Sequence, residues 1–174
     1  MKDVLRTKSM SVKNNELYIG DYSCRYLKEK FRTPLYVYDE THIRYKLDIF
    51  KKYFVSDKFE CKVVYASKAF FCPYLASIID EYDMGMDSVS LGDLYMIKHS
   101  MFPMEEVVLH GNNKSEEELI YAINNNVGII VCDSFNEIKK ISSLGIDKKV
   151  HILLRVNPGI EAHTHEYIQT SLLS

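Results

Sequence analysis

Hydrophobic positions along the chain alternate between short apolar runs and longer stretches with helical spacing. The apolar runs are rich in β-branched and aromatic residues, which is typical of strands buried in a sheet. The intervening stretches place apolar residues three or four positions apart, as in helices with one buried face. The pattern predicts strands at Leu35–Tyr38, Lys62–Ala66, Met86–Val89, Val107–Leu109, Gly128–Cys132 and Val150–Val156. It predicts helices at His42–Tyr53, Pro73–Tyr82, Leu91–His99, Ser115–Asn125 and Ser134–Leu144.

Two of these helices have a recognisable start. Ser115 is followed by Glu118, and Ser134 by Glu137, at the Ser-x-x-Glu spacing of a capping box. In such a box the serine and glutamate side chains each accept a hydrogen bond from the other residue's backbone N–H. Two glycines lie where a left-handed residue would end a helix, Gly85 and Gly145.

Strands alternating with helices predict an α/β fold with a parallel sheet. Such units either close into a (β/α)8 barrel or spread as an open doubly wound sheet, and their spacing alone does not separate the two. No predicted strand is followed by Gly-x-Gly-x-x-Gly or Gly-x-x-x-x-Gly-Lys, which disfavours a dinucleotide or P-loop site. Six strands are fewer than a closed barrel needs. Residues before Thr33 do not follow the alternation, and Glu16–Ile19 is predicted to be a strand of another sheet.

Composition and charge narrow the function classes. The 174 residues include 22 Lys and Arg against 24 Asp and Glu, a formal net charge of −2, with 47% hydrophobic and 26% charged residues. This is ordinary globular composition, without the basic excess that would neutralise a nucleic-acid backbone. Met1–Met10 lacks the apolar core of a signal peptide, and no later run is long enough to cross a bilayer. We therefore expect a cytoplasmic protein that binds neither nucleic acid nor membrane.

The cysteines give no sign of a disulfide scaffold or a zinc knuckle. They are widely separated and never form a Cys-x-x-Cys pair. We expect reduced and mostly buried thiols at Cys24, Cys61, Cys72 and Cys132.

Polar residues collect just after the predicted strands, where parallel α/β proteins place their reactive groups. The set comprises Ser67, Lys68, Ser90, Gly92, His110–Lys114, Asp133 and Arg155–Gly159. Lys68 differs from the rest because it lies between two apolar segments. Partial desolvation there would lower the pKa of its amine, and a neutral amine can attack a carbonyl to form a Schiff base. On position alone, a lysine that extends from the rim of the sheet into solvent is the more common situation.

Six short motifs follow one another along the chain. They are Thr33–Asp39, Tyr65–Phe70, Asp87–Leu94, His110–Ser115, Arg155–Gly159 and His163–Thr170. In this order they resemble motifs of the fold type III, alanine-racemase-like decarboxylases, which use pyridoxal phosphate. Within that family they are most similar to the diaminopimelate decarboxylases. The Tyr65–Phe70 motif, YASKAF, resembles the segment that carries the family's cofactor lysine, whereas Asp93 replaces the family's Glu.

The resemblance implies a partial (β/α)8 TIM barrel of the alanine-racemase type, truncated before closure. It implies decarboxylation of meso-2,6-diaminopimelate to L-lysine with pyridoxal 5'-phosphate as cofactor. Lys68 would be the catalytic residue that holds the cofactor, with Asp87 near the same end and Arg155 near the ring face. Without the resemblance, Asp87 would be interpreted as a turn carboxylate and Arg155 as one half of a surface ion pair.

Two further clusters receive weaker roles. His110–Lys114 is expected to line the site without acting in catalysis, and the alternative is a strand-to-helix turn whose asparagines adopt left-handed geometry. His163 and His165 flank one residue, with no other ligand cluster nearby. We expect them to have a structural or loop role, and we expect no metal site.

The resemblance also has consequences for organisation. Residues 1–32 are expected to associate with the family's C-terminal β domain, and residues 33–174 to form an incomplete cofactor-binding barrel. After Thr170 the sequence Ser171–Ser174 departs from the family pattern, so we expect a fragment with little or no activity alone. The full-length family enzyme is expected to be a homodimer. The alternatives are an ornithine or arginine decarboxylase of the same fold, a non-catalytic pyridoxal phosphate protein, or a vestigial fragment.

Overall fold

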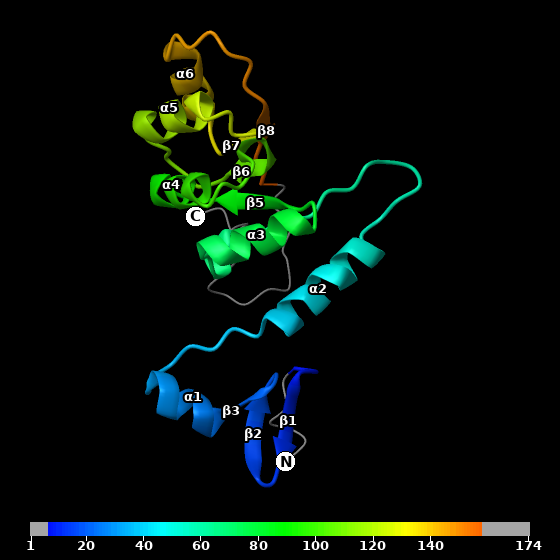
Figure 1. Cartoon of the computed structure of the whole chain (residues 1–174). Helices are drawn as coiled ribbons and strands as arrows, with labels where there is room; N and C mark the ends of the chain where they lie inside the picture. The colour runs from blue at the N-terminus through cyan, green and yellow to red at the C-terminus, as the bar shows by residue number, and fades with distance from the viewer. Residues whose placement is uncertain (1–6, 158–174) are drawn as a thin grey trace. The chain divides into compact units, whose positions relative to one another are not determined.

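The computed structural model describes residues 7–157, and the chain divides between Val63 and Val64 into two compact units (Figure 1). The predicted domain boundary after residue 32 falls inside the first unit and remains a prediction. No helix in the described part of the chain is long and apolar enough to span a membrane.

The first unit begins with a small antiparallel sheet. Its strands β1 (Met10–Lys13), β2 (Glu16–Ile19) and β3 (Tyr22–Ser23) pair in chain order. Asn14 and Asn15 have φ values of 49° and 61°, as a two-residue hairpin turn between right-twisted strands requires. The strand predicted at Glu16–Ile19, in a sheet separate from the parallel one, is confirmed.

Two helices complete this unit, α1 (Cys24–Phe31) and α2 (Glu40–Tyr53). The side chain of Asp39 caps α2 by accepting a hydrogen bond from the backbone N–H of His42 (3.1 Å), and it also accepts one from the Ser9 hydroxyl. The strand predicted at Leu35–Tyr38 is wrong, because this segment pairs with no described strand and leaves its side chains exposed. Its apolar and aromatic residues gave the same local signal as a buried strand.

The second unit is a five-stranded parallel sheet with helices between its strands. The strands are β4 (Val64–Tyr65), β5 (Gly85–Ser88), β6 (Val107–Leu109), β7 (Ile129–Cys132) and β8 (Ile152–Leu154). The intervening helices are α3 (Pro73–Glu81), α4 (Leu91–His99), α5 (Glu116–Asn124) and α6 (Phe135–Ser143). All five remaining predicted strands and all five predicted helices are thus found, with bounds that differ from the predicted ones by at most two residues at either end.

The order of the strands separates the two architectures that spacing left open. Neighbours follow the chain, β4-β5-β6-β7-β8, and every pair is parallel. A doubly wound sheet reverses its order at a switch point, whereas a barrel does not. Each helix from α3 to α6 packs on the next (Figure 1). Five parallel strands in chain order, with helices packed side by side, are the arrangement of part of a (β/α)8 barrel.

The core lies between the central strands and these helices. Every residue of β6 is buried, as expected for a strand covered on both faces. At the edge of the sheet, by contrast, every residue of β8 is exposed. The apolar surface of β8 is what a further strand of a barrel would cover.

The helix ends confirm part of the capping prediction and correct the rest. Ser115 and Glu118 form the full reciprocal box. Ser134 accepts from the backbone N–H of Glu137, but the Glu137 carboxylate bonds elsewhere, so the second predicted box is only half formed. Gly145 is left-handed as predicted, with φ 64°. The prediction for Gly85 is wrong, because Gly85 belongs to β5 and the left-handed residue of that turn is Asp83.

The four cysteines are free, as predicted. Only Cys132 is buried, whereas Cys24, Cys61 and Cys72 are partly exposed. The expectation of mostly buried thiols is therefore wrong. The three partly exposed cysteines lie near the ends of elements or in a loop, where fewer neighbours cover them.

Gly128 is required by close backbone packing at the start of β7. A Cβ atom there would lie 1.9 Å from the Glu105 carbonyl oxygen, whereas one at Gly92 would find nothing closer than 3.8 Å. We predict that Gly128→Ala lowers the free energy of unfolding by about 1–3 kcal/mol, because the backbone must shift. The control Gly92→Ala should raise it by about 0.5–1 kcal/mol, since alanine favours a helix. Urea unfolding of both variants tests this, and equal stability would contradict it.

Candidate functional site

The first part of the candidate site is the turn that follows β4. A short 3₁₀ helix, Ser67–Ala69, carries Lys68 at the carboxyl end of the strand. The Tyr65 hydroxyl donates a hydrogen bond to the carbonyl of Phe70 (2.8 Å), so the turn is closed across its base. Asp87, on the neighbouring strand β5, accepts from the backbone N–H of Ser67 (2.6 Å). The carboxylate of Asp87 thereby holds the residue next to Lys68.

Lys68 is an exposed residue, as in the alternative interpretation of a lysine that extends from the rim of the sheet into solvent. It lies on the turn that follows β4, which is an edge strand of the described sheet. Its amine is therefore open to reagents.

The second part is the loop His110–Lys114, which follows β6. Gly111 has φ 96° and Asn113 has φ 52°, as expected of a strand-to-helix turn. A Cβ atom at Gly111 would lie 2.9 Å from the Val89 carbonyl oxygen, so only glycine fits this approach. The left-handed asparagine predicted as an alternative is thus present, and a site-lining role for the loop remains a prediction.

Lys114 lies at the end of this loop, and the sequence did not indicate that its side chain is buried. Its side chain is only 2% exposed. The ammonium donates to the carbonyls of Gly111 (2.5 Å) and Val131 (2.6 Å) and lies 3.3 Å from the Glu137 carboxylate. These partners match the three donors of a lysine ammonium. A lysine bound in this way is unavailable as a nucleophile, in contrast to Lys68.

Glu137 is the buried partner of Lys114 and is 3% exposed. Burial alone would raise the pKa of its carboxyl group. Hydrogen bonds from the backbone N–H groups of Asp133 and Lys114, together with the Lys114 charge, outweigh that effect and lower the pKa. For the neighbouring thiol of Cys132, burial and the Glu137 charge raise the pKa. The Glu137 carboxylate is therefore ionised at neutral pH, beside a thiol whose raised pKa disfavours the reactive thiolate.

The third part of the site is Arg155, which follows β8. Its guanidinium lies 3.2 Å from the carboxylate of Asp133, the residue that follows β7. The ion pair that was the alternative interpretation of Arg155 is thus present. A cavity of about 230 Å³ lies beside it, lined mainly by apolar side chains, including Phe135, Ile138 and Leu154.

The structure brings the predicted site residues together in two groups. Lys68 lies in the turn after β4 and Asp87 lies in the adjacent strand β5, at one edge of the sheet. Asp133 follows β7 and Arg155 follows β8, at the other edge. Both groups lie at the carboxyl ends of the strands, where barrel enzymes place their active sites. The four residues would face one another only around a common barrel interior.

A repeated carboxylate holds the loops at this end of the sheet. The third residue of each of α4, α5 and α6 is acidic: Asp93, Glu118 and Glu137. Glu118 accepts hydrogen bonds from Ser115 and from Leu91, which begins the preceding helix. The shorter side chain of Asp93 reaches only the backbone N–H of Val89, in its own unit. The two glutamates thus connect one βα unit to the one before it.

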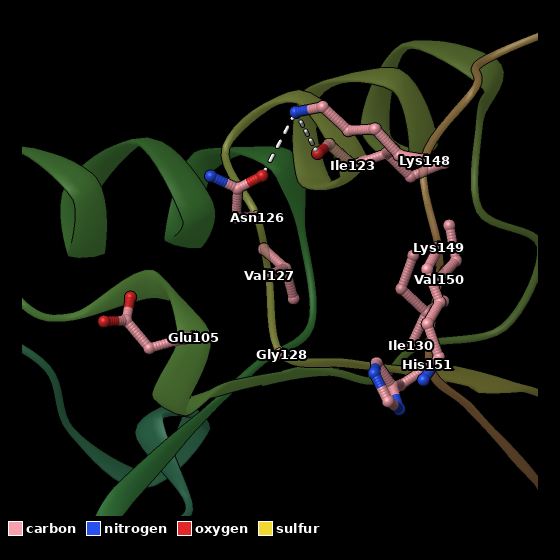
Figure 2. A pocket seen from close by; sticks show the side chains of 10 residues that line it. All are labelled: Glu105, Ile123, Asn126, Val127, Gly128, Ile130, Lys148, Lys149, Val150 and His151. Carbon is pink, nitrogen blue, oxygen red and sulfur yellow. Dashed lines mark hydrogen bonds between the residues drawn. The ribbon is translucent and has the colours of Figure 1, made fainter.

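The opposite ends of the strands hold a cavity of about 210 Å³ (Figure 2). Figure 2 shows that its charged side chains do not converge: Lys148 extends to the end of α5, while Glu105 lies apart. The Lys148 ammonium caps that helix by donating to the carbonyl of Ile123 (3.3 Å) and to the side chain of Asn126 (3.1 Å). At this end of a barrel such contacts support stability rather than catalysis.

Metal ligation finds no support in residues 7–157, which contain no group of three His, Cys, Asp or Glu side chains suited to a metal ion. His163 and His165, for which a structural or loop role was predicted, lie outside the described residues.

Comparison with known proteins connects this geometry to a family. Residues 40–174 match the family model for the pyridoxal-binding domain of pyridoxal-dependent decarboxylases. The chain belongs to this family. The matched domain is the one that binds pyridoxal in this family, which confirms the cofactor that the resemblance implied. The prediction of a partial (β/α)8 barrel is confirmed with it.

Curated relatives point to one branch of the family. The chain is 42% identical over 168 residues to diaminopimelate decarboxylase of Bacillus subtilis, and 44% identical over 156 residues to that of Bacillus methanolicus. These matches cover 95% and 88% of this chain, but only 38% and 36% of the relatives. The chain therefore spans little more than a third of the length of these enzymes.

Solved structures agree with the sequence relatives. The crystal structure of diaminopimelate decarboxylase from M. jannaschii in co-complex with L-lysine matches with a TM-score of 0.79 at 32% identity, over 93% of this chain and 39% of that one. The Helicobacter pylori enzyme complexed with L-lysine matches with a TM-score of 0.72 at 31% identity, over 84% of this chain and 37% of that one. A lysine/ornithine decarboxylase from Vibrio vulnificus, 20% identical, shares the fold.

Breaking the buried Lys114–Glu137 pair should strongly destabilise the second unit. We predict that Lys114→Met lowers the free energy of unfolding by about 3–5 kcal/mol, because it leaves the Glu137 charge buried without its partner. Replacing both residues, as Lys114→Met with Glu137→Leu, should recover most of the loss. The exposed lysine control Lys98→Met should change stability by less than about 0.5 kcal/mol. Denaturant unfolding measures all three, and a Lys114→Met variant as stable as the control would contradict the prediction.

Proposed function

We propose that this chain provides the cofactor-binding lysine of a pyridoxal phosphate-dependent decarboxylase that acts on meso-2,6-diaminopimelate and yields L-lysine. One observation carries the proposal: Lys68 is an exposed amine on a turn at the carboxyl end of β4, within a chain that belongs to this family. Lys114, which also lies at the carboxyl end of the sheet, has its ammonium bound by three partners.

The described residues fit the cofactor at two points. The Lys68 amine is accessible for covalent attachment to an aldehyde. The guanidinium of Arg155 is 54% exposed at the same end of the sheet, where it can face an aromatic ring or an anionic group. When bound, pyridoxal phosphate supplies an electron sink for the charge left on the substrate carbon after loss of carbon dioxide.

The chain's own groups would then divide the work. Lys68 would hold the cofactor through its side-chain amine. Asp87 orients the Lys68 turn through the backbone N–H of Ser67, so its carboxylate stays at the cofactor end of the site. Arg155, oriented by Asp133, contributes positive charge near the ring.

The choice of substrate follows the relatives. Those that are 38–44% identical to this chain are named diaminopimelate decarboxylases, and two related structures hold L-lysine, the product of that reaction. The named lysine/ornithine and ornithine decarboxylases are only 18–22% identical and support the fold alone. We further propose a cytoplasmic enzyme that acts as a homodimer, with residues 1–32 packed on the C-terminal β domain of the family.

Reductive labelling tests the role of Lys68. We predict that the chain treated with pyridoxal phosphate and then borohydride carries a stable adduct, and that peptide mapping places most of it on Lys68. Lys68→Arg should abolish this adduct, because the guanidinium does not attack the aldehyde under these conditions. The matched control Lys98→Arg should leave it unchanged. Label spread evenly over exposed lysines, or retained in Lys68→Arg, would refute the assignment.

The same reaction tests the substrate. An amine that takes the place of Lys68 on the cofactor protects the lysine from reduction. We therefore expect meso-diaminopimelate, added before borohydride, to reduce the label on Lys68 more than ornithine does at the same concentration. Equal protection would favour the ornithine alternative.

Asp87 should matter through the hydrogen bond that it accepts from Ser67. We predict that Asp87→Ala lowers the rate of adduct formation on Lys68 by about tenfold, the equivalent of about 1.4 kcal/mol for one such hydrogen bond. Asp87→Asn keeps an oxygen acceptor at the same place and should lose less than about threefold. Stopped labelling reactions with peptide quantification measure both rates. Equal rates in the two variants would show that the acceptor is not what matters.

A further inference from the structure

The position of Arg155 depends on a neighbouring loop. Its guanidinium is 54% exposed, and the contact that holds it is the Asp133 carboxylate at 3.2 Å. Asp133 itself is only 18% exposed. Asp133 follows β7 and Arg155 follows β8. The position of the guanidinium therefore depends on the position of the loop that carries Asp133.

That loop is fixed by Glu137. One oxygen of the Glu137 carboxylate accepts from the backbone N–H of Asp133 at 2.7 Å. The other accepts from the backbone N–H of Lys114 at 3.1 Å and lies 3.3 Å from the Lys114 ammonium. The two oxygens of one buried side chain thus join the loop after β6 to the loop after β7.

This is not the bonding expected of a helix cap. At the same position of the preceding helix, Glu118 accepts from the backbone N–H of the capping residue, Ser115. Glu137 instead accepts from Asp133, which precedes the capping residue Ser134, although Ser134 still accepts from Glu137. The carboxylate has therefore been redirected from its own cap toward the residue that pairs with Arg155.

We propose that Glu137 is a positioning residue for Arg155, acting through the backbone of Asp133, with Lys114 as its countercharge. The link to the cofactor rests on the proposed function, which assigns Arg155 to the ring face. Glu137 does not touch substrate or cofactor in this proposal. It sets where the Asp133 carboxylate stands, and so where the guanidinium points.

Two double variants separate positioning from stability alone. Lys114→Met with Glu137→Leu removes the buried charges and also the acceptor for Asp133. Lys114→Met with Glu137→Gln removes the charges but keeps an amide oxygen that can accept from the Asp133 N–H. If the pair were only a stabilising contact, the Arg155 side chain should be equally well ordered in both variants once they fold. If Glu137 positions Arg155, that side chain should keep its order only in the glutamine variant.

The measurement is nuclear magnetic resonance on the folded 174-residue chain. We expect the leucine double variant to exchange its Asp133 amide hydrogen about tenfold faster than the glutamine double variant. In the leucine double variant we also expect the order parameter of the Arg155 Nε–H to fall to the value measured in Asp133→Ala. Asp133→Ala removes the ion pair directly. Matched exchange rates and matched order parameters in the two double variants would overturn the proposal. Core amides in β6, measured in the same spectra, confirm that both variants are folded.

Cofactor binding gives a second and separable result. The leucine double variant should form the reduced pyridoxal phosphate adduct on Lys68 several-fold less efficiently than the glutamine double variant. If the unmodified chain forms no adduct, the proposed function fails, while the exchange and relaxation data still decide whether Glu137 positions Arg155. If adduct yields match although Arg155 loses order, the guanidinium is not part of the cofactor site and the link to the cofactor is refuted.

Discussion

The carboxyl edge of the parallel sheet depends on acidic side chains that accept hydrogen bonds from loop backbone N–H groups. Loops at strand ends and the first turns of helices leave such donors without partners in the helix itself. Asp87, Glu118 and Glu137 each accept from a donor in the βα unit before their own. A negative side chain near a helix N-terminus is also favoured by the helix dipole. The same contacts therefore cap helices and hold successive units in register.

This arrangement assigns different roles to two lysines at one edge. Lys114 neutralises a buried carboxylate and has carbonyl oxygens around the rest of its ammonium. Lys68 is held through the backbone of its turn, by the bonds of Ser67 to Asp87 and of Tyr65 to Phe70, and its side chain remains exposed. A rigid turn that carries a free amine is what attachment of an aldehyde cofactor requires. Lys114 and Lys68 have the same side chain, and their different roles follow from the groups that surround each of them.

Much of the fold could be predicted from local pattern. Capping serines and apolar periodicity located the helices, because both are properties of neighbouring residues. Leu35–Tyr38 misled because its apolar and aromatic residues carry the same signal as a strand, while pairing depends on a partner elsewhere in the chain. For the same reason the Tyr65–Phe70 motif identified Lys68 as the candidate cofactor lysine but did not predict that it is exposed. Its exposure depends on the position of β4 at the edge of the described sheet.

The buried pair shows the limit of reasoning from spacing. Ser134 and Glu137 have the spacing of a capping box, yet the glutamate turns to Asp133 and Lys114. Lys114 and Glu137 are 23 residues apart, and only the parallel packing of β6 against β7 brings them together. A lysine in a polar loop motif gives no sequence signal of burial, since its neighbours His110–Asn113 are themselves polar or glycine.

The central claim is that Asp87 binds only the backbone beside Lys68, so its amine stays accessible, whereas Glu137 binds the Lys114 ammonium itself. Amine reactivity in the native chain tests this claim. Trace acylation with acetic anhydride, followed by peptide mass analysis, gives the relative reactivity of each lysine. The account predicts that Lys68 reacts at a rate close to that of the exposed Lys98, and that Lys114 stays unmodified until the chain is unfolded in urea. Native-state acylation of Lys114 at the rate of Lys68 would contradict it.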